Sequence, residues 1–121
     1  MKPILVRGGS LKEFFFAPEG CFITEVWNTA DDEGLSIARA RVSPGATTTP
    51  HFLDGVTERY LIVQGKGRME AGVLEGVEVN AGDLVIFPDK NPQSITNTGE
   101  DDLIFYAICT PRFKPGSYRG L

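Results

Sequence analysis

Short runs of β-branched and aromatic residues recur along the chain, and clusters of turn-forming residues such as "TADDEG", "QGKG" and "NTGEDD" separate them. No segment keeps the period of 3.6 residues that is typical of a surface helix. The pattern therefore predicts an all-β sandwich or barrel, with at most a helical turn near "SLKEFFF". The predicted strands are residues 21–27, 35–42, 58–63, 68–73, 84–88, 93–97 and 103–108.

Composition narrows the class of protein further. The 121 residues, 41% of them hydrophobic, fit a single domain over residues 1–121. The net charge is -4 and no basic run stands out, so we expect no nucleic-acid or membrane partner and a small organic molecule as ligand. Without a long apolar segment or a signal peptide, the chain is expected to be cytoplasmic, with Cys21 and Cys109 reduced.

The stretch "PHFLDGVTERY" contains the single histidine of the chain, His51, and a glutamate seven positions later, Glu58. An odd separation places two residues on opposite faces of one strand. If Asp54 and Gly55 form a two-residue type I′ turn, however, His51 lies directly opposite Glu58 on the neighbouring strand. The sequence thus predicts a hairpin that brings the imidazole and the carboxylate together.

A second hairpin is predicted at Gly65 and Lys66, with Ile62 opposite Met69. Together the two hairpins give one mainly apolar face with a polar pair, which suits the interior of a small ligand-binding barrel. Its predicted members are Thr49, His51, Leu53, Glu58, Tyr60, Ile62 and Met69.

The spacing of these residues resembles the cupin superfamily, small jelly-roll β-barrels with two signature motifs. The first usually runs Gly, five residues, His-x-His, three or four residues, Glu, six residues, Gly, and the second begins Pro-Gly-Asp. The resemblance covers about residues 35–110 and implies an all-β jelly-roll barrel, but cupins include many enzymes and non-enzymatic binders, so fold alone does not imply function. The matching positions are Gly45, His51, Glu58 and Gly65 in the first motif and Gly82, Asp83, Pro88 and Asn97 in the second.

Two positions where the cupin pattern has histidine carry other residues. Leu53 has no ligand atom, and Gln93 offers a neutral amide oxygen. The resemblance leaves His51, Glu58 and Gln93 as candidate ligands of a divalent metal ion (Mn, Fe, Zn or Ni), with the preference shifted towards harder ions such as Mn. Such an ion would polarise a carbonyl group or orient an enediol-like substrate.

Several functions remain open on this basis. The preferred hypothesis is a metal-assisted enzyme of isomerase, cyclase, lyase or dioxygenase type, with His51 or Glu58 moving a proton. Without a metal, the same two residues form a possible acid–base dyad, and the resemblance implies a sugar isomerase or epimerase. The remaining alternatives are a non-catalytic binding or sensory cupin and a buried ion pair that only fixes the hairpin.

Four further residues are candidate ligand contacts. Tyr60 and Met69 lie on the predicted inner face. Arg39 and Arg41 alternate with alanines and share one face of their strand. If that face is the interior, the two guanidinium groups would bind a carboxylate or phosphate; otherwise they lie on the outer surface.

The other face of the predicted sheet carries Leu61 and Val63, which are too apolar for an uncovered surface. We expect the "EFFF" segment or a second subunit to cover it. Small cupins commonly pair through their outer sheet, so the resemblance implies a homodimer. The C-terminal "TPRFKPGSYRGL" is predicted to be an irregular strap over a neighbouring surface.

Overall fold

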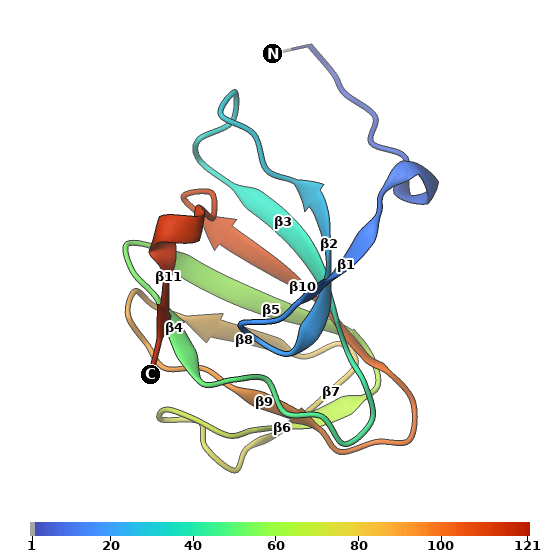
Figure 1. The fold of residues 1–121 in the computed structure, drawn as a ribbon, viewed down its shortest axis with the longest axis vertical. Helices are drawn as coiled ribbons and strands as arrows, with labels where there is room; N and C mark the ends of the chain where they lie inside the picture. The colour runs from blue at the N-terminus through green and yellow to red at the C-terminus, as the bar shows by residue number, and fades with distance from the viewer. Residues whose placement is uncertain (1) are drawn as a thin grey trace.

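The computed structural model describes residues 2–121, and strands dominate this part of the chain. Helix is limited there to two 3₁₀ turns, η1 (Gly8–Ser10) and η2 (Pro115–Ser117). The strands, shown in Figure 1, are β1 (Glu13–Phe16), β2 (Cys21–Trp27), β3 (Ser36–Val42), β4 (His51–Leu53), β5 (Thr57–Gln64), β6 (Lys66–Met69), β7 (Glu78–Asn80), β8 (Leu84–Phe87), β9 (Ile95–Asn97), β10 (Leu103–Thr110) and β11 (Tyr118–Gly120).

The strands form three antiparallel groups that enclose one interior. The largest is a six-stranded sheet in the order β1-β2-β3-β10-β5-β8, and the others are a three-stranded sheet, β7-β6-β9, and the pair β11-β4. Figure 1 shows β4, β11 and the three-stranded sheet lying around one face of the large sheet. The predicted all-β fold is confirmed.

The core lies on the inner face of the large sheet, and β5 shows how the sequence produces it. Burial alternates along this strand, because successive side chains point to opposite faces. Glu58, Tyr60 and Ile62 are buried, whereas Leu61 and Val63 are exposed. The Tyr60 ring is stacked on Phe105 at 4.1 Å between centroids.

The hairpin predicted at Asp54 and Gly55 is wrong. β4 pairs with β11, which places His51 opposite Gly120, whereas β5 pairs with β10 and β8. The turn at Asp54 and Gly55 is hydrogen-bonded to the loop that follows β8 and does not close a hairpin between β4 and β5. The Leu53 carbonyl accepts a hydrogen bond from the Lys90 N–H, and the Gly55 N–H donates to Asp89. The two strands therefore diverge into different groups.

The hairpin predicted at Gly65 and Lys66 is also wrong, because β5 belongs to the six-stranded sheet and β6 to the three-stranded sheet. Ile62 does not pair with Met69; β6 pairs with β7 and β9. Gly65 is the corner between the sheets. Its φ of 81° lies in the left-handed region, and a Cβ there would be 2.8 Å from a backbone oxygen.

The "EFFF" segment does not cover the outer face of β5. It forms β1 at the edge of the large sheet farthest from β8. Leu61 and Val63 remain 37% and 45% exposed, and Leu84 and Ile86 of β8 are 55% and 54% exposed. The prediction that the "EFFF" segment covers this face is therefore wrong, and coverage by a second subunit stays a prediction.

The C-terminal segment lies as a strap along β4, and it is regular where β11 pairs with β4. The Leu121 N–H donates to the Pro50 carbonyl. Cys21 and Cys109 are free and buried. Within residues 2–121, none of the helical segments has the length and apolar character needed to span a membrane.

Candidate functional site

A cavity of about 90 Å³ lies between the inner face of the six-stranded sheet and the pair β4–β11. It reaches the surface beside Phe14 and Glu25, which are exposed. Most of its wall is apolar, as in typical small-molecule sites. The aromatic residues in the wall are Phe14, Phe16, Tyr60, Phe105, Phe113 and Tyr118, and the ionisable acids and base are Glu19, Glu25, His51 and Glu58.

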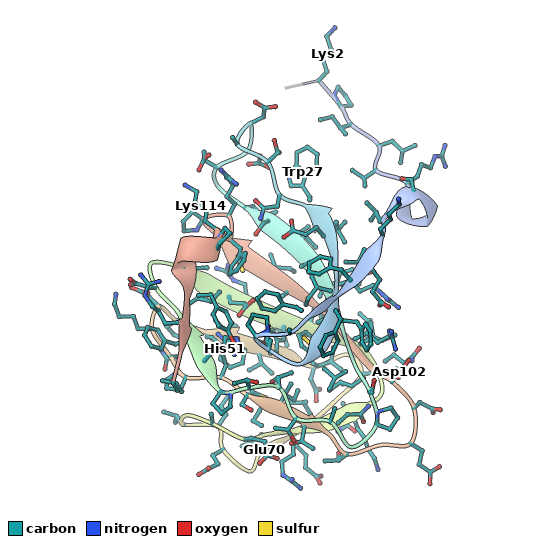
Figure 2. The ribbon with its side chains drawn as sticks, viewed as in Figure 1. Lys2, Trp27, His51, Glu70, Asp102 and Lys114 are labelled. Atoms are coloured by element: carbon teal, nitrogen blue, oxygen red, sulfur yellow. The ribbon has the colours of Figure 1, made fainter. Side chains whose placement is uncertain are left out.

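His51 is held in one orientation inside this cavity (Figure 2), and its side chain is 3% exposed. Its Nδ1 lies 2.8 Å from the Thr49 carbonyl oxygen. A carbonyl oxygen only accepts, so Nδ1 carries a hydrogen and donates it. Tyr118 of β11 stacks on the imidazole, with 4.8 Å between ring centroids. The second ring nitrogen, Nε2, is therefore the one left for chemistry.

Nε2 of His51 faces Glu19, whose Oε1 lies 3.3 Å away. Glu19 belongs to the turn between β1 and β2, and its carbonyl oxygen accepts a hydrogen bond from the Thr49 N–H at 2.9 Å. Burial raises the pKa of the Glu19 carboxyl, and the charge of His51 opposes that rise. The Glu19 carboxyl and Nε2 of His51 are thus close enough for a proton to pass between them.

Glu58 contributes a second carboxyl to the cavity. Its Oε2 accepts a hydrogen bond from the Cys109 thiol at 3.5 Å. Its Oε1 is the one buried side-chain nitrogen or oxygen without a hydrogen-bond partner among residues 2–121. The pKa of this carboxyl is raised to about 8, first because burial disfavours the charged form and second because of the charge of Glu19. At neutral pH a neutral carboxyl can donate a hydrogen bond to a ligand.

The donors present do not fit the predicted metal site. Gln93 lies beside His51 through two backbone hydrogen bonds, but its Oε1 accepts the Tyr60 hydroxyl at 2.6 Å and it does not line the cavity. In the described part of the chain, no three His, Cys, Asp or Glu side chains are grouped as metal ligands.

The other candidate residues are distributed between the cavity, the core and the outer surface. Tyr60 lines the cavity, but Met69 is fully buried in the core and does not. Arg39 and Arg41 lie on the outer face, where Arg41 binds Glu13 at 2.7 Å. The outer-surface alternative is therefore the one observed, and neither guanidinium group reaches the cavity.

Two residues of the site were missed from the sequence, Glu19 and Tyr118. Glu19 follows a proline and precedes a glycine in "APEG", a combination that indicates a turn and says nothing about a partner. Tyr118 lies in the short C-terminal strand, whose pairing with β4 has no local signal. Both residues reach His51 only through contacts between distant segments.

The fold is a β-barrel built from packed antiparallel sheets, with a cavity in its interior. Residues 16–114 match the Cupin family, and the chain belongs to it. No curated protein sequence matches the chain.

Solved structures share the fold at low sequence identity. Pac13 of Streptomyces, a nucleoside dehydratase, is 18% identical with a TM-score of 0.80, over 99% of this chain and 92% of that one. KdgF from Halomonas sp. is 18% identical with a TM-score of 0.79, over 93% and 97% of the two chains. A predicted oxalate decarboxylase from Thermotoga maritima is 23% identical with a TM-score of 0.72, over 89% and 99%.

Proposed function

We propose that this cupin binds a small polar organic molecule in its barrel and transfers a proton at a carbon atom next to a carbonyl group. The observation that carries the proposal is the arrangement of His51, fixed at Nδ1 by Thr49 and facing Glu19 at Nε2. Glu58, whose Oε1 has no hydrogen-bond partner, lines the same cavity. This combination of a base and a neutral acid belongs to the isomerase and lyase classes.

The roles follow from the environment of each group. The neutral Glu58 carboxyl donates a hydrogen bond to the carbonyl oxygen of the ligand, which acidifies the neighbouring C–H. The His51–Glu19 pair accepts the carbon-bound proton and returns it to the same or another carbon. The apolar wall excludes water, which strengthens both interactions. That a structural neighbour is a dehydratase agrees with proton transfer in this fold.

Hydroxyacetone is a suitable probe because a cavity of about 90 Å³ is smaller than one that takes benzene, which limits a ligand to roughly three to five non-hydrogen atoms. In deuterium oxide, the protein should accelerate exchange of the hydrogens next to the carbonyl group, followed by proton NMR. His51→Asn and Glu58→Gln should each slow the exchange by about a hundredfold or more, since acid–base groups contribute on that scale.

Glu78→Gln is the matched control, because Glu78 is exposed and outside the cavity wall. Equal exchange in the wild-type and His51→Asn proteins would refute the assigned base. If hydroxyacetone shifts the NMR signal of His51 but exchanges only as fast as in buffer, the protein is a non-catalytic binder.

The metal-assisted hypothesis, with a divalent ion on His51, Glu58 and Gln93, is tested separately. Elemental analysis of chelator-free protein loaded with Mn, Fe or Zn should give the same low metal content for the wild type and His51→Ala. Stoichiometric metal in the wild type that disappears in His51→Ala would favour the metal-assisted enzyme instead.

A further inference from the structure

The side chains of the cavity wall that can carry a charge near neutral pH are unbalanced in sign. Three are glutamates, Glu19, Glu25 and Glu58, and one is a histidine, His51. Among residues 2–121, no lysine or arginine contributes to the wall. Arg39 and Arg41, on the strand that contributes Ala38 and Ala40 to the wall, are on the outer face and bind Glu13. The cavity thus has several groups that repel an anion and one that attracts it.

The one cation of the wall is already compensated. When His51 is protonated, the carboxylate of Glu19 lies 3.3 Å from Nε2, and Nδ1 is bonded to a neutral carbonyl. A ligand carboxylate would have to displace Glu19, which is held by its backbone bond to Thr49 and is itself 13% exposed at its side chain. An anion entering the cavity therefore gains no unpaired positive charge.

The rest of the wall also makes the transfer of an anion from water into the cavity unfavourable. An anion that enters loses its water among aromatic and aliphatic side chains, which is unfavourable unless a counter-charge replaces the water. If Glu58 is ionised, it repels the anion; if it is neutral, it offers one hydrogen bond and no charge. Glu25, at the exposed mouth, repels an anion before entry. With Glu19 ionised beside a protonated His51, the wall disfavours anions whether Glu58 is ionised or neutral.

We propose that the cavity selects uncharged carbonyl and amide compounds and excludes carboxylate anions of the same size and shape. This inference rests on the proposed function, because it takes the location of the ligand site from there. It restricts the substrate class to neutral carbonyl compounds, which carry their reacting C–H next to an uncharged C=O group. Carboxylate acids of comparable size are not substrates on this reasoning.

Isosteric pairs test the selectivity directly. Acetamide and acetate, and glycolamide and glycolate, differ mainly in charge at neutral pH. His51 is the single histidine in the chain, so the untagged protein gives one imidazole Cε1–H signal in proton NMR. Each amide should shift this signal with at least about tenfold tighter binding than its acid, because one ionised carboxylate nearby is sufficient for that difference.

Charge removal provides a second measurement. Glu58→Gln and, at the mouth, Glu25→Gln should each reduce the ratio of amide to acid affinity, whereas Glu78→Gln should leave it unchanged. Glu25 is exposed, so its variant keeps the test valid if Glu58→Gln does not fold. A ratio that is the same in all three variants overturns the role of the carboxyl groups.

Failure of this inference differs from failure of the proposed function. Acids that bind as tightly as amides, with hydroxyacetone exchange retained, overturn the selectivity alone. Amides preferred over acids, with no accelerated exchange, overturn the enzyme and leave the selectivity. A His51 signal that no amide or acid shifts up to about 0.1 M, a range in which fragments of this size are detectable, overturns the selectivity.

Discussion

Glu58→Gln should stabilise the protein at alkaline pH, because the wild-type carboxyl is buried without a partner for Oε1. Its pKa is about 8 in the folded chain against a model-compound value of 4.5. Folding is therefore unaffected by this group below about pH 4.5 and is progressively opposed as the pH rises, since the unfolded chain ionises first. The unfavourable contribution reaches its full size once the pH exceeds the folded pKa and stays constant above it.

The difference between the two pKa values corresponds to at most about 5 kcal/mol at pH 8 and above. We expect urea unfolding to show the wild type losing about 2 to 4 kcal/mol between about pH 5 and pH 8 relative to Glu58→Gln. The surface variant Glu78→Gln should follow the wild type. Parallel pH profiles for the wild type and Glu58→Gln would refute the idea that Glu58 is desolvated in the folded chain.

Three further changes test other parts of the structure. In urea titrations, Tyr60→Phe should lower the free energy of unfolding by about 1 to 3 kcal/mol, because it leaves the buried Gln93 oxygen without its donor. The control Tyr106→Phe, which removes a hydroxyl from the outer face, should have little effect. Gly65→Ala should lower the melting temperature by several degrees, about 2 kcal/mol or more, and an unchanged value would contradict the tight corner described here. The predicted homodimer should dissociate in sedimentation velocity when Leu84→Glu places a charge on the exposed apolar face, and a wild-type protein that sediments as a monomer at every concentration would end that prediction.

Periodicity and motif spacing were sufficient to predict the fold class. Burial alternates along β5, whereas β10 is a continuous apolar run, and both patterns are local signals of a strand. Lys90 shows that the backbone keeps the conformation expected from the second cupin motif even where the residue differs. The second cupin motif continues with Pro-x-Gly, and Lys90, two residues after Pro88, stands at the position of that glycine. Its φ of 66° lies in the left-handed region that glycine prefers.

Strand pairing could not be predicted in the same way. A turn containing Asp54 and Gly55 favours a two-residue hairpin locally, but hydrogen bonds from the distant loop around Asp89 overrule it. His51 and Glu58 still line one cavity, because each lies on an inward-facing position of its own strand group. No local sequence pattern indicates the role of Glu19. Its role depends on a contact with His51, and β2 and β3 lie between the two residues in the chain.

The site around His51 is assembled from segments that are far apart in the chain. Glu19 comes from the first turn, His51 from β4, Glu58 from β5 and Tyr118 from β11. Contacts of such long sequence range close late and slow the folding of β-proteins to milliseconds or longer. A form of the chain that lacks any one of these contacts lacks the complete cavity, so during refolding ligand binding should recover with the final kinetic phase and report the fraction of native molecules.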